Sequence, residues 1–151
     1  LEAAPRLAKA VRRTLALNHC DPNVEVIESA ISYDTGDTVS FALRKSSVSG
    51  SIAADAGSLP TIEVPACTLS QLIKRHNLTD FALVGDIEGA EWRILKNDLE
   101  ALASARMIVM ETHDSPGNGS YEDLIAALQA TGRFDLIDRH GPVVVLKPKA
   151  A

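Results

Sequence analysis

Three acidic residues stand close together directly after a short apolar run. Asp86, Glu88 and Glu91 follow residues 81–84, which are too few for a helix and are typical of a strand buried on both faces. Apolar residues then recur at three- and four-residue intervals up to Leu102, which predicts one helix after the acids. Open α/β folds bind ligands at the carboxyl ends of parallel strands, so we expect the chemistry of this chain here.

A second group of titratable residues follows another predicted strand. Residues 107–110 are apolar, and Glu111 and His113 come at their end. Histidine is the side chain whose ordinary pKa lies nearest to neutrality, so His113 is a candidate for proton transfer. Two strand ends that both carry polar groups predict one shared site at the edge of a sheet.

Structural roles compete with chemical ones for these residues. Glu91 falls in the first turn of the predicted helix, where the helix dipole favours a negative charge. Asp86 or Glu88 can cap exposed amides, and His113 can be an ordinary loop side chain. Both interpretations stay open from the residues alone.

The remaining pattern predicts an α/β sandwich in a single domain covering residues 1–151. Strands alternate with helices and a hairpin closes the chain, which indicates a mostly parallel sheet with a C-terminal antiparallel hairpin. A serine-rich stretch from 44 to 59 is expected to be a long loop. The other expected strands cover 24–27, 38–43, 61–64 (ended or edged by Pro65), 134–137 and 143–146, and the other expected helices cover 6–18, 69–76 and the segment from 121 to Gly132.

Composition and charge exclude several classes of partner. Fifteen basic and twenty acidic residues give a net charge of -5, which repels nucleic acid. No apolar stretch approaches the roughly 20 residues that span a bilayer, and no signal peptide is visible. Cys20 and Cys67 lack CxxC spacing and the four histidines are dispersed, so we expect reduced thiols, no closed metal site and a cytoplasmic location.

The motifs together resemble the FkbM family of S-adenosylmethionine-dependent methyltransferases. The most specific part is the DIEGAE run at 86–91, which has VPACTL at 64–69 before it and IVMETH at 108–113 after it. Weaker matches extend the resemblance over about residues 1 to 146; they are the acidic segment 2–5, Asn18, the AIS segment 30–32 and Gly36.

The resemblance implies a Rossmann-like class I methyltransferase fold with S-adenosyl-L-methionine as cofactor. By the same resemblance Glu2 matches the acid that holds the cofactor ribose, and Ser29 and Ala30 match the segment near the adenine. Asp86 matches the acid near the methyl group and the substrate. We assign substrate contacts to the remaining acids of the motifs, Glu88, Glu91 and Glu111.

Two departures from the family pattern bear on activity. Val84 stands where family members commonly have a lysine. The first strand and its glycine-rich loop, which cradle the methionine end of the cofactor, are expected before Leu1. We therefore expect an N-terminally incomplete enzyme domain, which by itself binds the cofactor weakly or not at all.

The implied reaction is O-methylation of a hydroxyl on a sugar or natural-product small molecule. A hydroxyl is a poor nucleophile unless a positioned base removes its proton as the new bond forms. Asp86 and His113 are the candidate catalytic residues because both are expected at strand ends. No metal is assigned to this reaction.

Three other functions remain open from the sequence. A hydrolase could use Mg²⁺ or Mn²⁺ bound by the oxygen- and nitrogen-bearing side chains Asp86, Glu88, Glu111 and His113. A nicotinamide-dependent dehydrogenase would suit the acid Glu2, but the chain has no GxGxxG motif. A binding-only remnant without catalysis is the third. The sequence does not indicate an oligomeric state.

Overall fold

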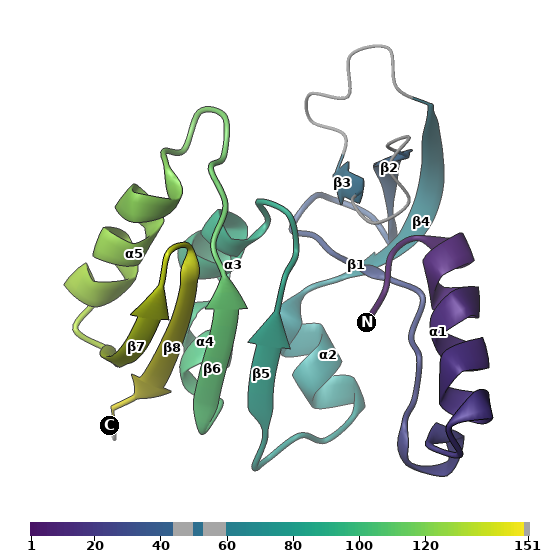
Figure 1. Ribbon diagram of the computed structural model, residues 1–151. Coiled ribbons are helices and arrows are strands. Elements are labelled where there is room, and N and C mark those ends of the chain that lie inside the picture. Colours follow the sequence, from purple (N-terminus) through teal and green to yellow (C-terminus); the bar gives the residue numbers. More distant parts are fainter. Residues whose placement is uncertain (44–49, 53–59, 150–151) are drawn as a thin grey trace. The chain divides into compact units, whose positions relative to one another are not determined.

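The chain divides into two compact units, Leu1–Cys67 and Thr68–Ala151. The structure is a computed structural model that describes residues 1–43, 50–52 and 60–149 (Figure 1). Most of the predicted loop from 44 to 59 lies outside the described residues. Each unit holds one four-stranded sheet and is described by itself.

The N-terminal unit combines one long helix with a mixed sheet. Its strands lie in the order β1-β4-β2-β3, of which only the pair β1 and β4 is parallel. The elements are α1 (Pro5–Leu17), the 3₁₀-helix η1 (Asp21–Asn23), β1 (Ala30–Ile31), β2 (Thr38–Leu43), β3 (Gly50–Ile52) and β4 (Thr61–Cys67).

The core of this unit forms between the start of α1 and the sheet. Pro5 is the first residue of α1, where the missing N–H has no helical partner to lose. Ala4, just before it, is buried in one cluster with Phe41 and Val64, and Leu7 packs against that cluster. The alternating residues of β2 therefore do bury one face, as its sequence pattern predicts.

Three sequence predictions for this unit are wrong. The stretch from 44 to 59 is expected to be a loop, but it contains strand β3, which pairs with β2. Residues 24–27 form no strand; instead the Arg12 guanidinium holds this segment by donating to the Val26 carbonyl over 2.9 Å and to the Glu28 carboxylate. Strand β4 also runs through Pro65 to Cys67. Proline lacks an N–H, but Pro65 is the last residue of β4 that pairs with β2, and the pairing with β1 begins only at Ala66, so its missing donor falls at the junction of the two ladders.

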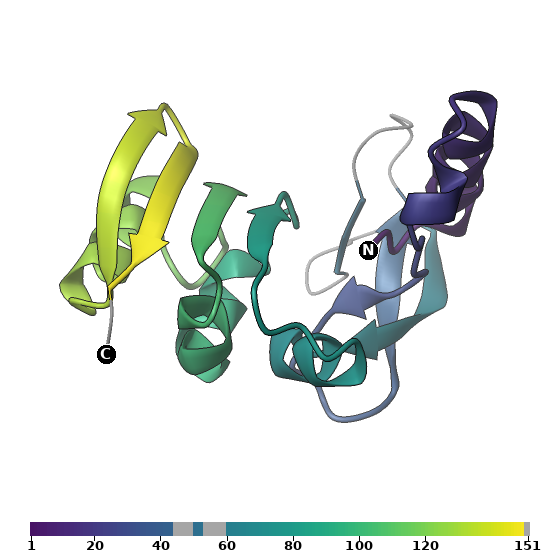
Figure 2. The same ribbon diagram turned by 90° about the horizontal axis from the view of Figure 1, so that it is seen from below.

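The C-terminal unit is a second mixed sheet with helices between its strands. The strands lie in the order β5-β6-β8-β7. Figure 2 shows α3, α4 and α5 on the same face of this sheet. The elements are α2 (Leu69–Arg75), β5 (Ala82–Gly85), α3 (Glu91–Asn97), α4 (Leu99–Ala103), β6 (Met107–Glu111), α5 (Tyr121–Ala130), β7 (Phe134–His140) and β8 (Val143–Pro148).

Strand pairing confirms the α/β class and the terminal hairpin but not a mostly parallel sheet. β5 and β6 are parallel, whereas β8 runs antiparallel to both β6 and β7. Among the described residues, each sheet contains one parallel pair of strands and two antiparallel pairs, so both sheets are mixed. No helix within the described ranges has the length and apolarity needed to cross a bilayer.

The prediction that residues 81–84 form a strand buried on both faces is wrong. β5 forms there, but Ala82 is exposed and the Val84 side chain is 79% exposed. Exposed residues alternate with partly buried ones along β5, so one face of this strand is covered and the other is open.

The single helix predicted after the acidic motif is two helices. α3 ends at Asn97 and α4 begins at Leu99, with Asp98 in a non-helical conformation between them. The Asp98 carboxylate accepts a hydrogen bond of 2.8 Å from the backbone N–H of Ser70, at the start of α2. This tertiary contact replaces the continuation of the helix.

Gly119, just before α5, is expected to resist substitution. Its φ is +140°, and a Cβ there would lie 3.0 Å from Asp123 Oδ2 and 3.3 Å from Trp92 Cζ2. Asp123 caps α5 together with Ser120, so a side chain at 119 would disturb that cap. We expect Gly119→Ala to lower the free energy of unfolding by about 1–3 kcal/mol more than Gly117→Ala.

Gly117→Ala is the matched control because its φ is also positive but no atom lies within 4 Å of the added Cβ. Chemical denaturation of both variants measures the difference. Equal losses would mean that crowding at Gly119 has no effect on stability.

Candidate functional site

The two predicted strand ends lie side by side in the C-terminal unit. Gly85 pairs with Met110 in the parallel ladder between β5 and β6. The chain therefore leaves both strands at the same edge of the sheet, with Asp86 directly after β5 and His113 two residues after β6. The expected meeting of the two motifs is confirmed for these residues by the contacts that follow.

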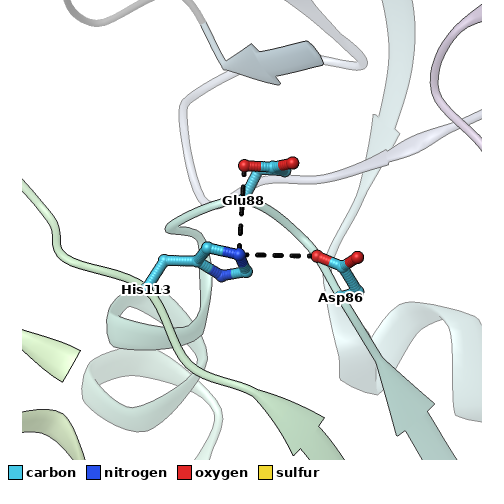
Figure 3. Close-up of side chains that lie close together, drawn as sticks. All are labelled: Asp86, Glu88 and His113. Carbon is cyan, nitrogen blue, oxygen red and sulfur yellow. Dashed lines mark ion pairs between the residues drawn. The ribbon is translucent and has the colours of Figure 1, made fainter. Parts of the chain in front are cut away.

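Three carboxylates, those of Asp86, Glu88 and Glu91, lie within 4 Å of the His113 ring nitrogens. Figure 3 shows the first two beside the ring. Nδ1 lies 2.9 Å from Oε1 of Glu91, which is hydrogen-bonding distance. Nε2 lies 3.6 Å from Oδ1 of Asp86 and 3.9 Å from Oε2 of Glu88. Nε2 makes no hydrogen bond to any residue that the structure describes, so it is available to an incoming group.

The turn between β5 and α3 determines where the acidic side chains lie. Glu88 has a φ of +52° and Gly89 a φ of +97°, so two successive residues are left-handed. Glycine adopts this conformation readily, whereas for glutamate it is strained. The reversal places Glu88 partly exposed, while Glu91, at the first position of α3, is buried with 0% of its side chain accessible.

Two anchors hold the segment that carries His113. Thr112 is buried, and both its N–H and its hydroxyl donate to the carbonyl of Pro142, over 3.0 and 2.6 Å. On the other side, the Asp114 carboxylate accepts from the N–H of Tyr121 at the start of α5, over 2.8 Å. The backbone on both sides of His113 is therefore fixed to neighbouring elements.

The environment shifts the pKa of both members of the His113–Glu91 pair upward. For Glu91, burial raises the pKa of the carboxyl, against the effect of hydrogen bonds from its own backbone and from His113. For His113, burial by itself lowers the pKa, but the hydrogen bond and charge of Glu91, with the charges of Glu88 and Asp86, outweigh it and the pKa lies above its ordinary value. The pair holds a proton to a higher pH than a free imidazole does.

Asp86, Glu88 and His113 also form a group that could hold a cation. One ligand atom from each lies within 4.8 Å of the others. Carboxylate oxygens are suitable ligands for Mg²⁺, Mn²⁺ and Zn²⁺, and the imidazole nitrogen suits Zn²⁺ and Mn²⁺ better than Mg²⁺. Glu111 is not in this group.

The other residues assigned from the sequence lie apart from the His113 cluster or in the other unit. Glu111 ends β6 and makes no hydrogen bond or ion pair with the cluster among the described side chains. In the N-terminal unit, Glu2 Oε1 accepts from the Ala4 N–H over 2.8 Å. Ser29 and Ala30 are buried, and Ala30 pairs with Ala66. The assignments of Glu2, Ser29 and Ala30 to the cofactor and of Glu111 to the substrate stay predictions.

Two features of the site do not follow from sequence reasoning. The hydrogen bond between Glu91 and His113 joins residues 22 positions apart, and only the strand pairing brings them together. Thr112 lies between two titratable residues and attracts no attention by its type. No signal in the sequence singles it out, because its role depends on the distant carbonyl of Pro142.

The chain is an α/β protein in which acidic residues and a histidine meet at the carboxyl ends of two parallel strands, β5 and β6. The chain matches the Methyltransferase FkbM domain family over residues 1–134. This chain therefore belongs to the FkbM methyltransferase family, as its motifs indicate. Comparison with curated proteins and with solved structures gave no significant match.

Proposed function

We propose that the chain supplies the catalytic edge of an S-adenosylmethionine-dependent enzyme that O-methylates a hydroxyl of a sugar or natural-product small molecule. Membership of the methyltransferase family supports the transfer of a methyl group. The observation that supports a hydroxyl as the acceptor is the state of His113 Nε2. This nitrogen makes no hydrogen bond to the described residues and faces two carboxylates. This proposal includes a Rossmann-like arrangement of the whole domain.

His113 has the properties of a general base for this step. If S-adenosylmethionine supplied the methyl group, the acceptor hydroxyl would give its proton to Nε2 of His113 as its oxygen took up the methyl carbon, and the electrons of the broken carbon–sulfur bond would stay on sulfur. Asp86 and Glu88 lie next to Nε2, and their charges stabilise the imidazolium that results. Asp86 is the second candidate base, since 60% of its side chain is exposed and its carboxylate can be reached by an acceptor.

The residues assigned to the cofactor have chemistry that suits it. S-adenosylmethionine, when bound, supplies an activated methyl group on a sulfonium. In Glu2, one carboxylate oxygen is held by Ala4, and the other has no partner among the described residues and can accept from a ribose hydroxyl. Ser29 and Ala30 are small but buried, so their assignment to the adenine rests on the family resemblance.

The first test is binding of the demethylated cofactor. We expect S-adenosylhomocysteine to raise the melting temperature of the full-length protein, because a ligand at 100 times its Kd stabilises the folded state by about 2.7 kcal/mol. Thermal unfolding measures the shift, and adenosine alone is the control. No shift at saturating concentration would contradict the proposed cofactor.

The second test is transfer itself. A methyl-labelled donor is offered with a panel of hydroxylated sugars and small natural products, and product mass is measured. We expect a gain of one methyl group on oxygen.

A metal-dependent hydrolase is the second candidate because of the 4.8 Å grouping of Asp86, Glu88 and His113. It predicts stabilisation by Mn²⁺ or Mg²⁺ and none by S-adenosylhomocysteine. The same thermal experiment with each metal, and with a chelator, therefore separates the two functions.

A further inference from the structure

Glu91 is placed where a carboxylate costs stability. Its side chain is wholly buried, and Oε2 has no hydrogen-bond partner among the residues that the structure describes. A buried polar atom without a partner loses its hydration without compensation, and the loss is larger when the group is charged. An apolar side chain of similar size would avoid that cost, so stability does not explain a glutamate here.

We propose that Glu91 is a positioning residue that holds the His113 ring with Nε2 as its proton-accepting nitrogen. The inference rests on the proposed function, in which His113 takes the proton of the acceptor hydroxyl. It assigns to Glu91 a role behind the histidine in place of the substrate contact expected from the sequence.

The first support is that Glu91 is itself held in place. It is the first residue of α3, whose next buried residues are Trp92 and Ile94. Oε1 also accepts from the backbone N–H of Ile87 over 3.3 Å. The carboxylate therefore has a fixed place on which the imidazole can be oriented.

The second support is the competition between the two ring nitrogens. Neutral imidazole has one N–H, and that proton goes to the nitrogen with the better acceptor. The Glu91 oxygen is 2.9 Å from Nδ1, whereas the oxygens of Asp86 and Glu88 are 3.6 and 3.9 Å from Nε2, beyond hydrogen-bonding distance. Nδ1 therefore carries the proton, and the lone pair stays on Nε2.

The third support is the rigidity of the histidine segment. Thr112 is bound to Pro142 through two hydrogen bonds, so the ring reaches Glu91 without a free loop between them. The pair is then a preformed unit and does not need to assemble when a substrate arrives.

The direct test is the tautomer of His113 in the full-length protein. Long-range proton–nitrogen NMR of the labelled histidine distinguishes a protonated Nδ1 from a protonated Nε2, with His113→Asn used to assign the signal. We expect Nδ1–H in the neutral form. A neutral ring with its proton on Nε2 overturns the proposal.

The kinetic test is Glu91→Gln. The amide keeps the shape but lacks the charge, and its NH₂ can face Nδ1 and reverse the tautomer. We expect kcat to fall about 100-fold with KM for the acceptor unchanged, since misplacement of a reacting group costs about that much. We also expect equal or greater stability, because the buried charge is gone.

The pH dependence of kcat/KM gives an independent test of the role of Glu91. Asp86, Glu88 and Glu91 are the charged groups that face His113, and removing the Glu91 charge leaves the imidazolium less stabilised. The acid limb of the kcat/KM profile is therefore expected to move to lower pH in Glu91→Gln. Glu100→Gln is the matched control, since Glu100 is exposed on α4 and binds Arg133.

The outcomes separate the two proposals. Unchanged kcat in Glu91→Gln, or an acid limb that moves to higher pH, overturns the role of Glu91. If the wild-type protein transfers no methyl group, the proposed function fails, and the NMR tautomer still decides whether Glu91 orients His113. The same measurement decides the matter if the glutamine variant does not fold.

Discussion

His113→Asn is expected to lower kcat/KM for methyl transfer by about 10²- to 10⁴-fold, the usual contribution of a general base. Asparagine can place an N–H near the position of Nδ1 and so keep the hydrogen bond to Glu91, but it has nothing in the place of Nε2. The variant therefore removes the base but leaves the buried Glu91 carboxylate with a hydrogen-bond donor. Steady-state rates with a labelled methyl donor measure the loss.

His140→Asn is the matched control, because His140 is exposed at the end of β7 and is not part of the cluster. It is expected to retain full activity. The stricter variant is Asp86→Ala combined with His113→Ala, which removes both candidate bases. Transfer that persists in this double variant would show that neither residue accepts the proton.

Ile108→Ala is expected to lower the free energy of unfolding by about 2–5 kcal/mol, the range for deleting a large side chain in a packed core. Ile108, the second residue of β6, is 0% exposed and pairs with Leu83 and Leu146 on neighbouring strands. The cavity would lie under the strand that carries His113, so binding of S-adenosylhomocysteine is a useful second measurement. Chemical denaturation gives the change in stability.

Ile137→Ala makes the same chemical change at a residue that is 55% exposed and lies at the register shift in β7. A surface change of this kind is expected to stay within about 0.5 kcal/mol. Similar losses for the two variants would mean that β6 is not the core strand of its sheet.

The sequence by itself determined the features that depend on neighbours in the chain. Ser120 and Asp123 predict the start of α5, and the structure shows both hydrogen bonds of that capping box. The alternation in 38–43 predicts β2 with the observed bounds. The motif at 86–91 identifies the family, and the two acid-bearing strand ends predict their own meeting.

The tertiary structure decided the features that depend on distant residues. The pattern after Glu91 predicts one helix, but a contact from Asp98 to α2 breaks it. An apolar run such as 81–84 has the same composition whether one face or both faces of its strand are covered, so only the tertiary structure shows that Val84 is exposed. Strand direction likewise depends on pairing across the chain, which is why the sheets are mixed.

The site shows the same division most clearly. The residue types at Glu91 and His113 are visible in the sequence, but a carboxylate's role depends on what surrounds it. Burial of Glu91 and its 2.9 Å hydrogen bond to His113 arise from packing between α3 and the end of β6. The sequence supplied the chemical groups, and the fold decided which of them faces the solvent and which lies behind it.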